Sequence, residues 1–164
     1  MRDDRDHQHL HDPEVLPERL PAFPRPFASV LAHVASLERA SGTQIGPTYE
    51  LRWRLEGPRL ELETVGVRSA TVELADADFF DVFASPFFNT LPVVRDGLLE
   101  AGPARDYVMQ FVAVPDLTVT RSKQRYKPRG ERLVRYSSGS FAADIEFDGD
   151  GFVTNYHGFL ERIS

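Results

Sequence analysis

The sequence predicts a mainly β protein of the α+β class, in which an antiparallel β-roll or open barrel wraps around a single α-helix. Two observations lead to this prediction. Beyond residue 50, apolar residues alternate with polar or charged ones in one segment after another, as in strands with one buried face. Turn sequences separate these segments roughly every ten residues, and only residues 25–41 have apolar residues at helical spacing. A sheet that curls around one helix accounts for both observations.

The chain of 164 residues has the length of one domain, since domains usually contain about 100 to 200 residues. Hydrophobic residues make up 41% of it and 12 are Phe, which is enough for a sizeable core. Residues 1–24 combine His7, His9 and His11 with prolines and scattered charges, and such a segment buries little apolar surface. We therefore expect a flexible, solvated polar tail over residues 1–24 and a single β-roll domain over residues 25–164.

Charge and composition limit the classes of function. The formal net charge of −6 argues against nucleic-acid binding, which requires a basic surface to neutralise phosphates. The lack of cysteine excludes disulfides, thiol chemistry and thiolate zinc sites. The charged N-terminus lacks the apolar run of a signal peptide, and no apolar stretch approaches the ~20 residues of a membrane-spanning helix. We therefore expect a cytoplasmic protein with no membrane span.

Residues 25–41 predict an amphipathic helix with one apolar face. Pro26 suits the first turn of this helix, and Gly42 suits its C-terminal end. We expect the apolar face to pack on the concave side of the sheet, because nothing else in the chain would cover it. The residues of this face are Phe27, Val30, Leu31, Val34 and Leu37.

The segment from Tyr49 to Val65 predicts a pair of strands. Leucine or tryptophan alternates with charged residues on both sides of Gly57-Pro58, which is a turn sequence. Further strand segments follow to the end of the chain, and we expect them to form one continuous antiparallel sheet.

The stretch "SPFFNTLPVVRDG", Ser85 to Gly97, is unusually apolar. Pro86 and Pro92 each remove a backbone donor, so they suit the ends of a strand or a bend. We interpret the stretch as a wall of the core, which also lines a ligand cleft if the roll leaves space behind it. The candidate apolar ligand contacts from this region are Phe79, Phe83, Phe87, Phe88 and Leu91.

Two rows of charge lie further along the chain. If the segments are extended, a period of two places each row on one face of a strand. Exposed ion pairs are the simplest role for both rows. The basic row also fits an anionic head group or phosphate, and the acidic row fits a divalent cation that activates water. The basic row is Arg121, Lys123, Arg125, Lys127 and Arg129, and the acidic row is Asp144, Glu146 and Asp148.

Contiguous signatures of catalysis are missing from the sequence. It contains no GxSxG elbow, no phosphate-binding GxxxxGK[ST] loop, no HExxH and no GxGxxG. A non-enzymatic binding role without a cofactor or catalytic residue is therefore favoured, although many active sites have no contiguous motif.

Three ordered motifs resemble a bacterial family of glycolipid-binding proteins. They are Ser85-Pro86 with Asn89-Thr90-Leu91-Pro92, then Val114-Pro115-Asp116-Leu117 with Gln124-Arg125-Tyr126, and then the hairpin from Ser138-Gly139 to Tyr156. The resemblance extends from about Asp78 to Arg162. It implies a spiral β-roll around one helix, often as a homodimer, with a lipid or glycolipid ligand and no assigned catalytic residues. Members of this family begin with additional strands, whereas residues 1–41 here predict a tail and a helix.

The interpretation that unites these features is a carrier or binding domain for an amphipathic molecule. Arg121, Arg125 and Tyr126 are the candidate polar contacts of such a ligand. One alternative comes from the hairpin "FAADIEFDGDGFV", which also looks like a strand pair of barrel-type, metal-dependent nucleoside diphosphate hydrolases. In that alternative the acidic row holds a divalent metal and the basic row binds phosphates. A third alternative is a structural homodimer whose apolar stretch forms the interface.

Overall fold

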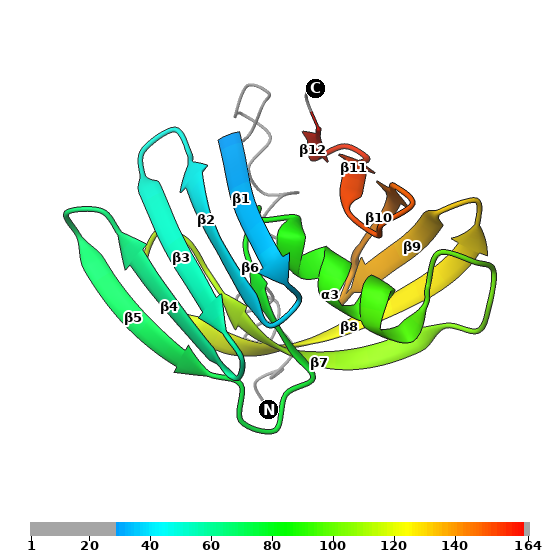
Figure 1. The fold of residues 1–164 in the computed structure, drawn as a ribbon, viewed down its shortest axis with the longest axis horizontal. Coiled ribbons are helices and arrows are strands. Elements are labelled where there is room, and N and C mark those ends of the chain that lie inside the picture. The colour runs from blue at the N-terminus through cyan, green and yellow to red at the C-terminus, as the bar shows by residue number, and fades with distance from the viewer. Residues whose placement is uncertain (1–28, 163–164) are drawn as a thin grey trace, which may run out of the picture.

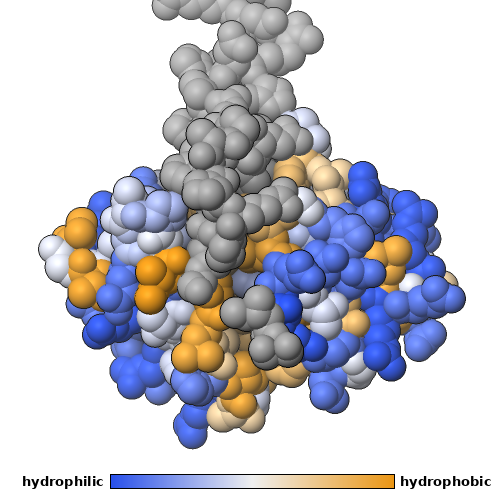
Figure 2. Space-filling view, turned by 90° about the horizontal axis from the view of Figure 1, so that it is seen from above, coloured by the Kyte–Doolittle hydropathy of each residue, from blue (hydrophilic) through white to orange (hydrophobic). Residues whose placement is uncertain are grey.

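The computed structural model describes residues 29–162, which form two β-sheets and one short helix (Figure 1). The predicted mainly β fold with a single helix is confirmed, although the helix lies elsewhere in the chain. The tail expected over residues 1–24 lies outside the described residues. Seen from above, hydrophilic residues cover most of both flanks, and hydrophobic residues gather toward the middle (Figure 2).

The first sheet is an antiparallel meander of five strands in chain order. Its strands are β1 (Ser29–Ser36), β2 (Arg39–Ile45), β3 (Glu50–Glu56), β4 (Arg59–Thr64) and β5 (Arg68–Glu73). In β3, Leu51, Trp53 and Leu55 are buried, while the alternating charged residues face solvent. The predicted strand pair around Gly57-Pro58 is therefore confirmed as β3 and β4. One face of this sheet belongs to the core, and the other carries mixed charges.

The helix predicted over residues 25–41 is wrong. Residues 29–41 form β1 and the start of β2, joined by a turn at Leu37 and Glu38. The apolar residues at helical spacing do not form one buried face, because Leu31 is 62% exposed and Val34 is 37% exposed. Pairing with β2 and β3 overrides the helical spacing, and the valines of β1 suit a strand. Residues 25–28 lie outside the described residues.

The second sheet has seven strands, in the order β12-β11-β10-β9-β8-β7-β6. The strands are β6 (Phe79–Val82), β7 (Arg105–Val112), β8 (Val119–Gly130), β9 (Leu133–Ser138), β10 (Phe141–Phe147), β11 (Val153–Tyr156) and β12 (Leu160–Glu161). All neighbours are antiparallel except β6 and β7, which run parallel. The expectation of one continuous antiparallel sheet is therefore wrong, since two sheets form and one pair is parallel.

The helix α3 (Phe87–Asp96) occupies the stretch that the sequence predicted as an extended wall of the core. It follows Pro86, contains Pro92 and ends at Gly97, whose φ of 66° gives the left-handed C-cap. Residues 87–93 are all buried, because α3 lies on the concave side of the second sheet and faces the first sheet as well (Figure 1). Because these seven residues are buried on every side of the helix, they show no polar stripe, and the helical period is not visible in the sequence. No helix in residues 29–162 is long and apolar enough to cross a membrane.

The core continues from one sheet to the other through α3. Trp53 of β3 packs against Phe87 and Phe88, with ring centroids 5.3 and 4.9 Å apart. On the side of the second sheet, Tyr126 and Tyr136 belong to a further buried cluster that includes Val93 of α3. The helix therefore fixes how the two sheets sit relative to each other, and clefts form at its two ends.

Candidate functional site

An apolar cleft lies beside the C-terminal half of α3, where it meets the ends of strands from the first sheet. Its volume of about 410 Å3 falls within the range of about 300–1,000 Å3 that is usual for small-molecule sites. Most of its wall is leucine and phenylalanine, drawn from the β1–β2 turn, β3, the chain after β5, β6 and α3. These apolar lining residues are Leu37, Leu55, Leu74, Phe79, Phe80 and Leu91.

Three charged side chains also line the apolar cleft: Glu38, Asp78 and Arg95. The Arg95 guanidinium carbon lies 4.1 Å from the centre of the Phe79 ring, an arrangement typical of a cation–π contact. Asp78 accepts a hydrogen bond from the Val108 backbone N–H at 2.8 Å. The cleft therefore combines apolar walls with a few charged groups at its edge.

Asp96 holds Arg95 in place. Arg95 Nε lies 3.2 Å from Asp96 Oδ1, and the Tyr107 hydroxyl donates to Asp96 Oδ2 at 2.6 Å. The hydrogen bonds from Arg95 and then Tyr107 lower the pKa of Asp96. Burial and then the hydrogen bond to Asp96 raise the pKa of Tyr107, which therefore stays protonated at neutral pH. The Arg95 charge is thus largely neutralised within the protein.

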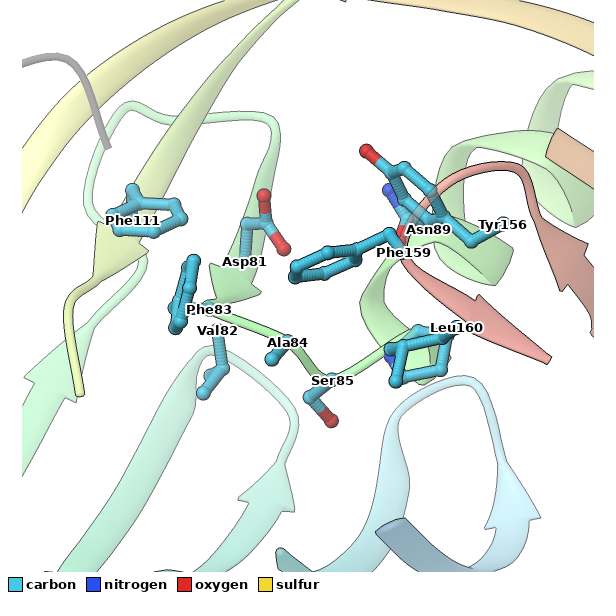
Figure 3. Close-up of a pocket in the computed structure, with 11 residues that line it drawn as sticks. Asp81, Val82, Phe83, Ala84, Ser85, Asn89, Phe111, Tyr156, Phe159 and Leu160 are labelled. Atoms are coloured by element: carbon cyan, nitrogen blue, oxygen red, sulfur yellow. The ribbon is translucent and has the colours of Figure 1, made fainter. Parts of the chain in front are cut away.

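A second, smaller pocket lies at the other end of α3, between the end of β6 and the C-terminal strands (Figure 3). Its volume of about 20 Å3 has room for about one water molecule. Figure 3 shows the Asp81 side chain between Phe83 and Phe159. Asp81 is only 6% exposed and its Oδ2 accepts a hydrogen bond from Gln124 Nε2 at 2.7 Å.

Asp81 begins a chain of buried polar side chains that crosses the concave side of the second sheet. Gln124 Oε1 accepts from the Tyr126 hydroxyl at 3.3 Å, and that hydroxyl accepts from Asn89 Nδ2 at 3.1 Å. The chain therefore links β6, β8 and the first turn of α3. Polar groups buried in this way are stable only when hydrogen-bonded, so the chain fixes the position of the helix.

The predicted ligand-contact residues do not gather in one place. Phe79 and Leu91 line the apolar cleft, whereas Phe83 lines the smaller pocket. Phe87 and Phe88 lie in the core against Trp53. Tyr126 is fully buried, and its hydroxyl accepts a hydrogen bond from Asn89 Nδ2. Arg121 and Arg125 are exposed and paired with Asp76 and Asp106.

Apart from Phe79 and Leu91, sequence reasoning missed the residues that shape the apolar cleft, among them Leu37, Leu55, Leu74 and Arg95. Each leucine lies at or beside the end of a strand, next to a turn. Their common position at strand ends is the only signal that sequence offers, and it identifies a site only when the sheets are placed in space.

Within residues 29–162, the basic row and the acidic row form no ion pairs with each other. Each carboxylate of the acidic row has its own partner: Asp144 with Arg135 at 3.2 Å, Glu146 with His157 at 3.1 Å, and Asp148 with Arg162 at 2.9 Å. Burial raises the pKa of Asp148, but hydrogen bonds from Arg162 and from the N–H groups of Phe152 and Asp150 outweigh it and lower that pKa. Among the described residues, no three metal-ligating side chains come together.

Comparison with known proteins identifies a solved structure of similar fold and the family of this chain. A crystal structure of a DUF1089 family protein from Pseudomonas aeruginosa matches with a TM-score of 0.71 and 21% sequence identity, covering 87% of this chain and 96% of that chain. No curated protein matches the chain. The family model described as "Putative glycolipid-binding" matches residues 28–162. This match also covers β1 to β5, whereas the resemblance seen in the sequence began only at about Asp78. The chain belongs to the family that this model describes.

Proposed function

We propose that the protein binds an amphipathic molecule of the glycolipid class, with the apolar chain in the apolar cleft and the polar head at Glu38, Asp78 and Arg95. The observation that carries this proposal is a cleft of about 410 Å3 with walls of leucine and phenylalanine and a few charged groups. The role implied by the family description supports the same class of ligand.

The charges at the cleft favour a neutral, hydroxyl-rich head group. Arg95 is already paired with Asp96, so it offers little attraction to an anion. Glu38 and Asp78 are acceptors and would repel a phosphate or carboxylate, whereas sugar hydroxyls can donate to them. A sugar head group therefore fits this rim better than an anionic head group does.

A chain-length series tests the proposal. Alkyl glucosides of increasing length are titrated below their micelle-forming concentrations by isothermal calorimetry. Each added methylene that enters the cleft should contribute about 0.8 kcal/mol, or about fourfold in affinity, until the cleft is full. Trp53, the single tryptophan, lies in the same strand as Leu55 and gives a fluorescence signal for the same titration.

A matched pair of variants locates the binding. Leu74→Glu places a charge on the wall of the apolar cleft at a half-buried position, so the fold should survive while binding is lost. Val67→Glu introduces the same charge at a position that is 78% exposed and outside the cleft, and it should bind like the wild type. Affinity that does not depend on chain length, or unchanged binding by the Leu74 variant, would overturn the proposal.

A further inference from the structure

The outer face of the second sheet carries a long row of cations. In β8 the buried residues alternate with exposed or half-buried ones, so the basic row predicted from the sequence does lie on one face. At about 3.3 Å per residue, its five side chains extend over about 26 Å. Because α3 covers the concave side of this sheet, the row lies on the convex side, away from the core (Figure 1). The five residues are Arg121, Lys123, Arg125, Lys127 and Arg129.

The protein neutralises this row only in part. Arg121 and Arg125 have exposed carboxylate partners, Asp76 and Asp106. Lys127 donates to the Gly102 carbonyl oxygen at 2.7 Å, which leaves its charge uncompensated. Within residues 29–162, neither Lys123 nor Arg129 has an ion-pair partner. Since the whole chain has a net charge of −6, this basic row opposes the overall charge. The acidic row residues Asp144 and Glu146 lie on the same face of the sheet two strands away, where Asp144 pairs with Arg135 and Glu146 with His157.

A groove crosses the row where two strands end at different points. β9 pairs with β8 from Arg125 onward, and β8 continues past the end of β9 at Ser138. The step leaves a groove of about 460 Å3, lined by Lys123, Arg125 and Ser137 together with Asp106 and Gly139. Asp106 lies 3.4 Å from Arg125, which is long for a charge-assisted hydrogen bond. Two cations and a hydroxyl group in one groove suit an anionic oxygen group such as a phosphate.

We propose that the convex face of β7, β8 and β9 docks on an anionic lipid bilayer, and that the groove at Lys123, Arg125 and Ser137 receives a lipid phosphate. A bilayer presents many phosphates at once, so it can engage a row as long as β8, and each basic residue near its surface adds to the attraction. The negative charge on the rest of the protein would turn this face toward the bilayer. The described row has no aromatic side chains on which unpaired bases could stack, which disfavours single-stranded nucleic acid.

Vesicle co-sedimentation tests this docking surface without any use of the apolar cleft. Binding to phosphatidylglycerol–phosphatidylcholine vesicles is compared with binding to pure phosphatidylcholine vesicles, at low and at high sodium chloride. We expect binding only to the anionic vesicles, weakening as salt shortens the range of the charges. Loss of one cation should weaken binding about fivefold, and the double variant Lys123→Gln/Arg125→Gln should bind about 25-fold more weakly.

A charge-matched control separates a local site from net charge. Arg52→Gln/Arg59→Gln removes the same charge from residues of similar exposure on the outer face of the first sheet, and should bind the vesicles like the wild type. Equal weakening in both double variants, equal binding to neutral vesicles, or displacement by single-stranded RNA at the same phosphate concentration would overturn the proposal. The Lys123/Arg125 variant should still bind alkyl glucosides as the wild type does. The vesicle experiment can therefore fail while glucoside binding in the apolar cleft is retained, and the reverse, so the two proposals are tested separately.

Discussion

Trp53 of β3 lies nearly parallel to Phe87 of α3, with ring centroids 5.3 Å apart and an angle of 21° between the ring planes. Phe88 meets the same indole at 4.9 Å in a tilted arrangement. One tryptophan from the first sheet therefore contacts two consecutive residues of α3, the helix that lies on the concave side of the second sheet. This contact couples the two sheets, and its loss should weaken their packing against each other.

The first prediction concerns Phe87 and Phe88. If the stretch were a strand, one ring would face away from the core, but in α3 the two side chains are 5% and 1% exposed. Phe87→Ala and Phe88→Ala should therefore each lower the free energy of unfolding by about 3 to 5 kcal/mol. Urea denaturation followed by Trp53 fluorescence measures both. Val67→Ala, at a 78% exposed position, is the control and should change stability little. A loss below about 1 kcal/mol for either phenylalanine would contradict this packing.

The second prediction concerns the space beside Trp53. Gly42 pairs with Trp53 across β2 and β3, and a Cβ atom at Gly42 would lie 2.4 Å from the indole ring. Gly42→Ala should therefore destabilise the protein by about 1–3 kcal/mol through overpacking, and should shift the fluorescence of Trp53. Gly57→Ala is the comparison, because a Cβ there meets nothing within 4 Å and only the positive φ of 55° opposes it. If only the Gly57 variant changed the emission of Trp53, the assigned contact would be incorrect.

The strands were more predictable than the helix, for a physical reason. β3 and β4 have one buried and one solvent-exposed face, so apolar and polar residues alternate along them and the alternation predicts which residues are buried. Residues 87–93 of α3 are all buried and include Pro92, so the segment shows neither a polar stripe nor the composition that is usual for a helix. Conversely, β1 has helical spacing of apolar residues but becomes a strand because β2 pairs with it.

The candidate site was less predictable than the fold. Phe79 and Leu91 of the apolar cleft could be identified because the surrounding stretch is conspicuously apolar. Leu37, Leu55 and Leu74 could not, because their approach to α3 depends on how the two sheets pack. The basic row could be placed on one face from its period of two alone, although its partners could not.

The third prediction concerns the buried polar chain. Gln124 Nε2 donates to Asp81 at 2.7 Å, and both side chains are almost completely buried. Gln124→Leu removes this donor and the acceptor for the Tyr126 hydroxyl, so the free energy of unfolding should fall by about 1.5–3 kcal/mol. Gln110→Leu, in the neighbouring strand β7 and only half-buried, should cost less. Chemical denaturation of the two variants compares them directly, and a larger loss for Gln110 would contradict a structural role for this chain.

The last prediction is a pH dependence of the free energy of unfolding, which arises from Asp96, the partner of Arg95 in the apolar cleft. The folded protein lowers the pKa of Asp96 through hydrogen bonds from Arg95 and Tyr107. A carboxyl whose pKa is lower in the folded state stabilises the fold fully above its unfolded pKa of about 3.9, and this contribution disappears as the pH falls through the folded pKa. Asp96→Asn should therefore cost about 1.5 kcal/mol at pH 7, and the difference from the wild type should shrink steadily below about pH 4. Tyr107→Phe removes only the hydrogen bond of 2.6 Å and should show the same trend with a smaller amplitude. Urea denaturation at pH 7, 4 and 3 measures both, and a penalty that stays constant over this range would mean that Asp96 does not titrate with folding.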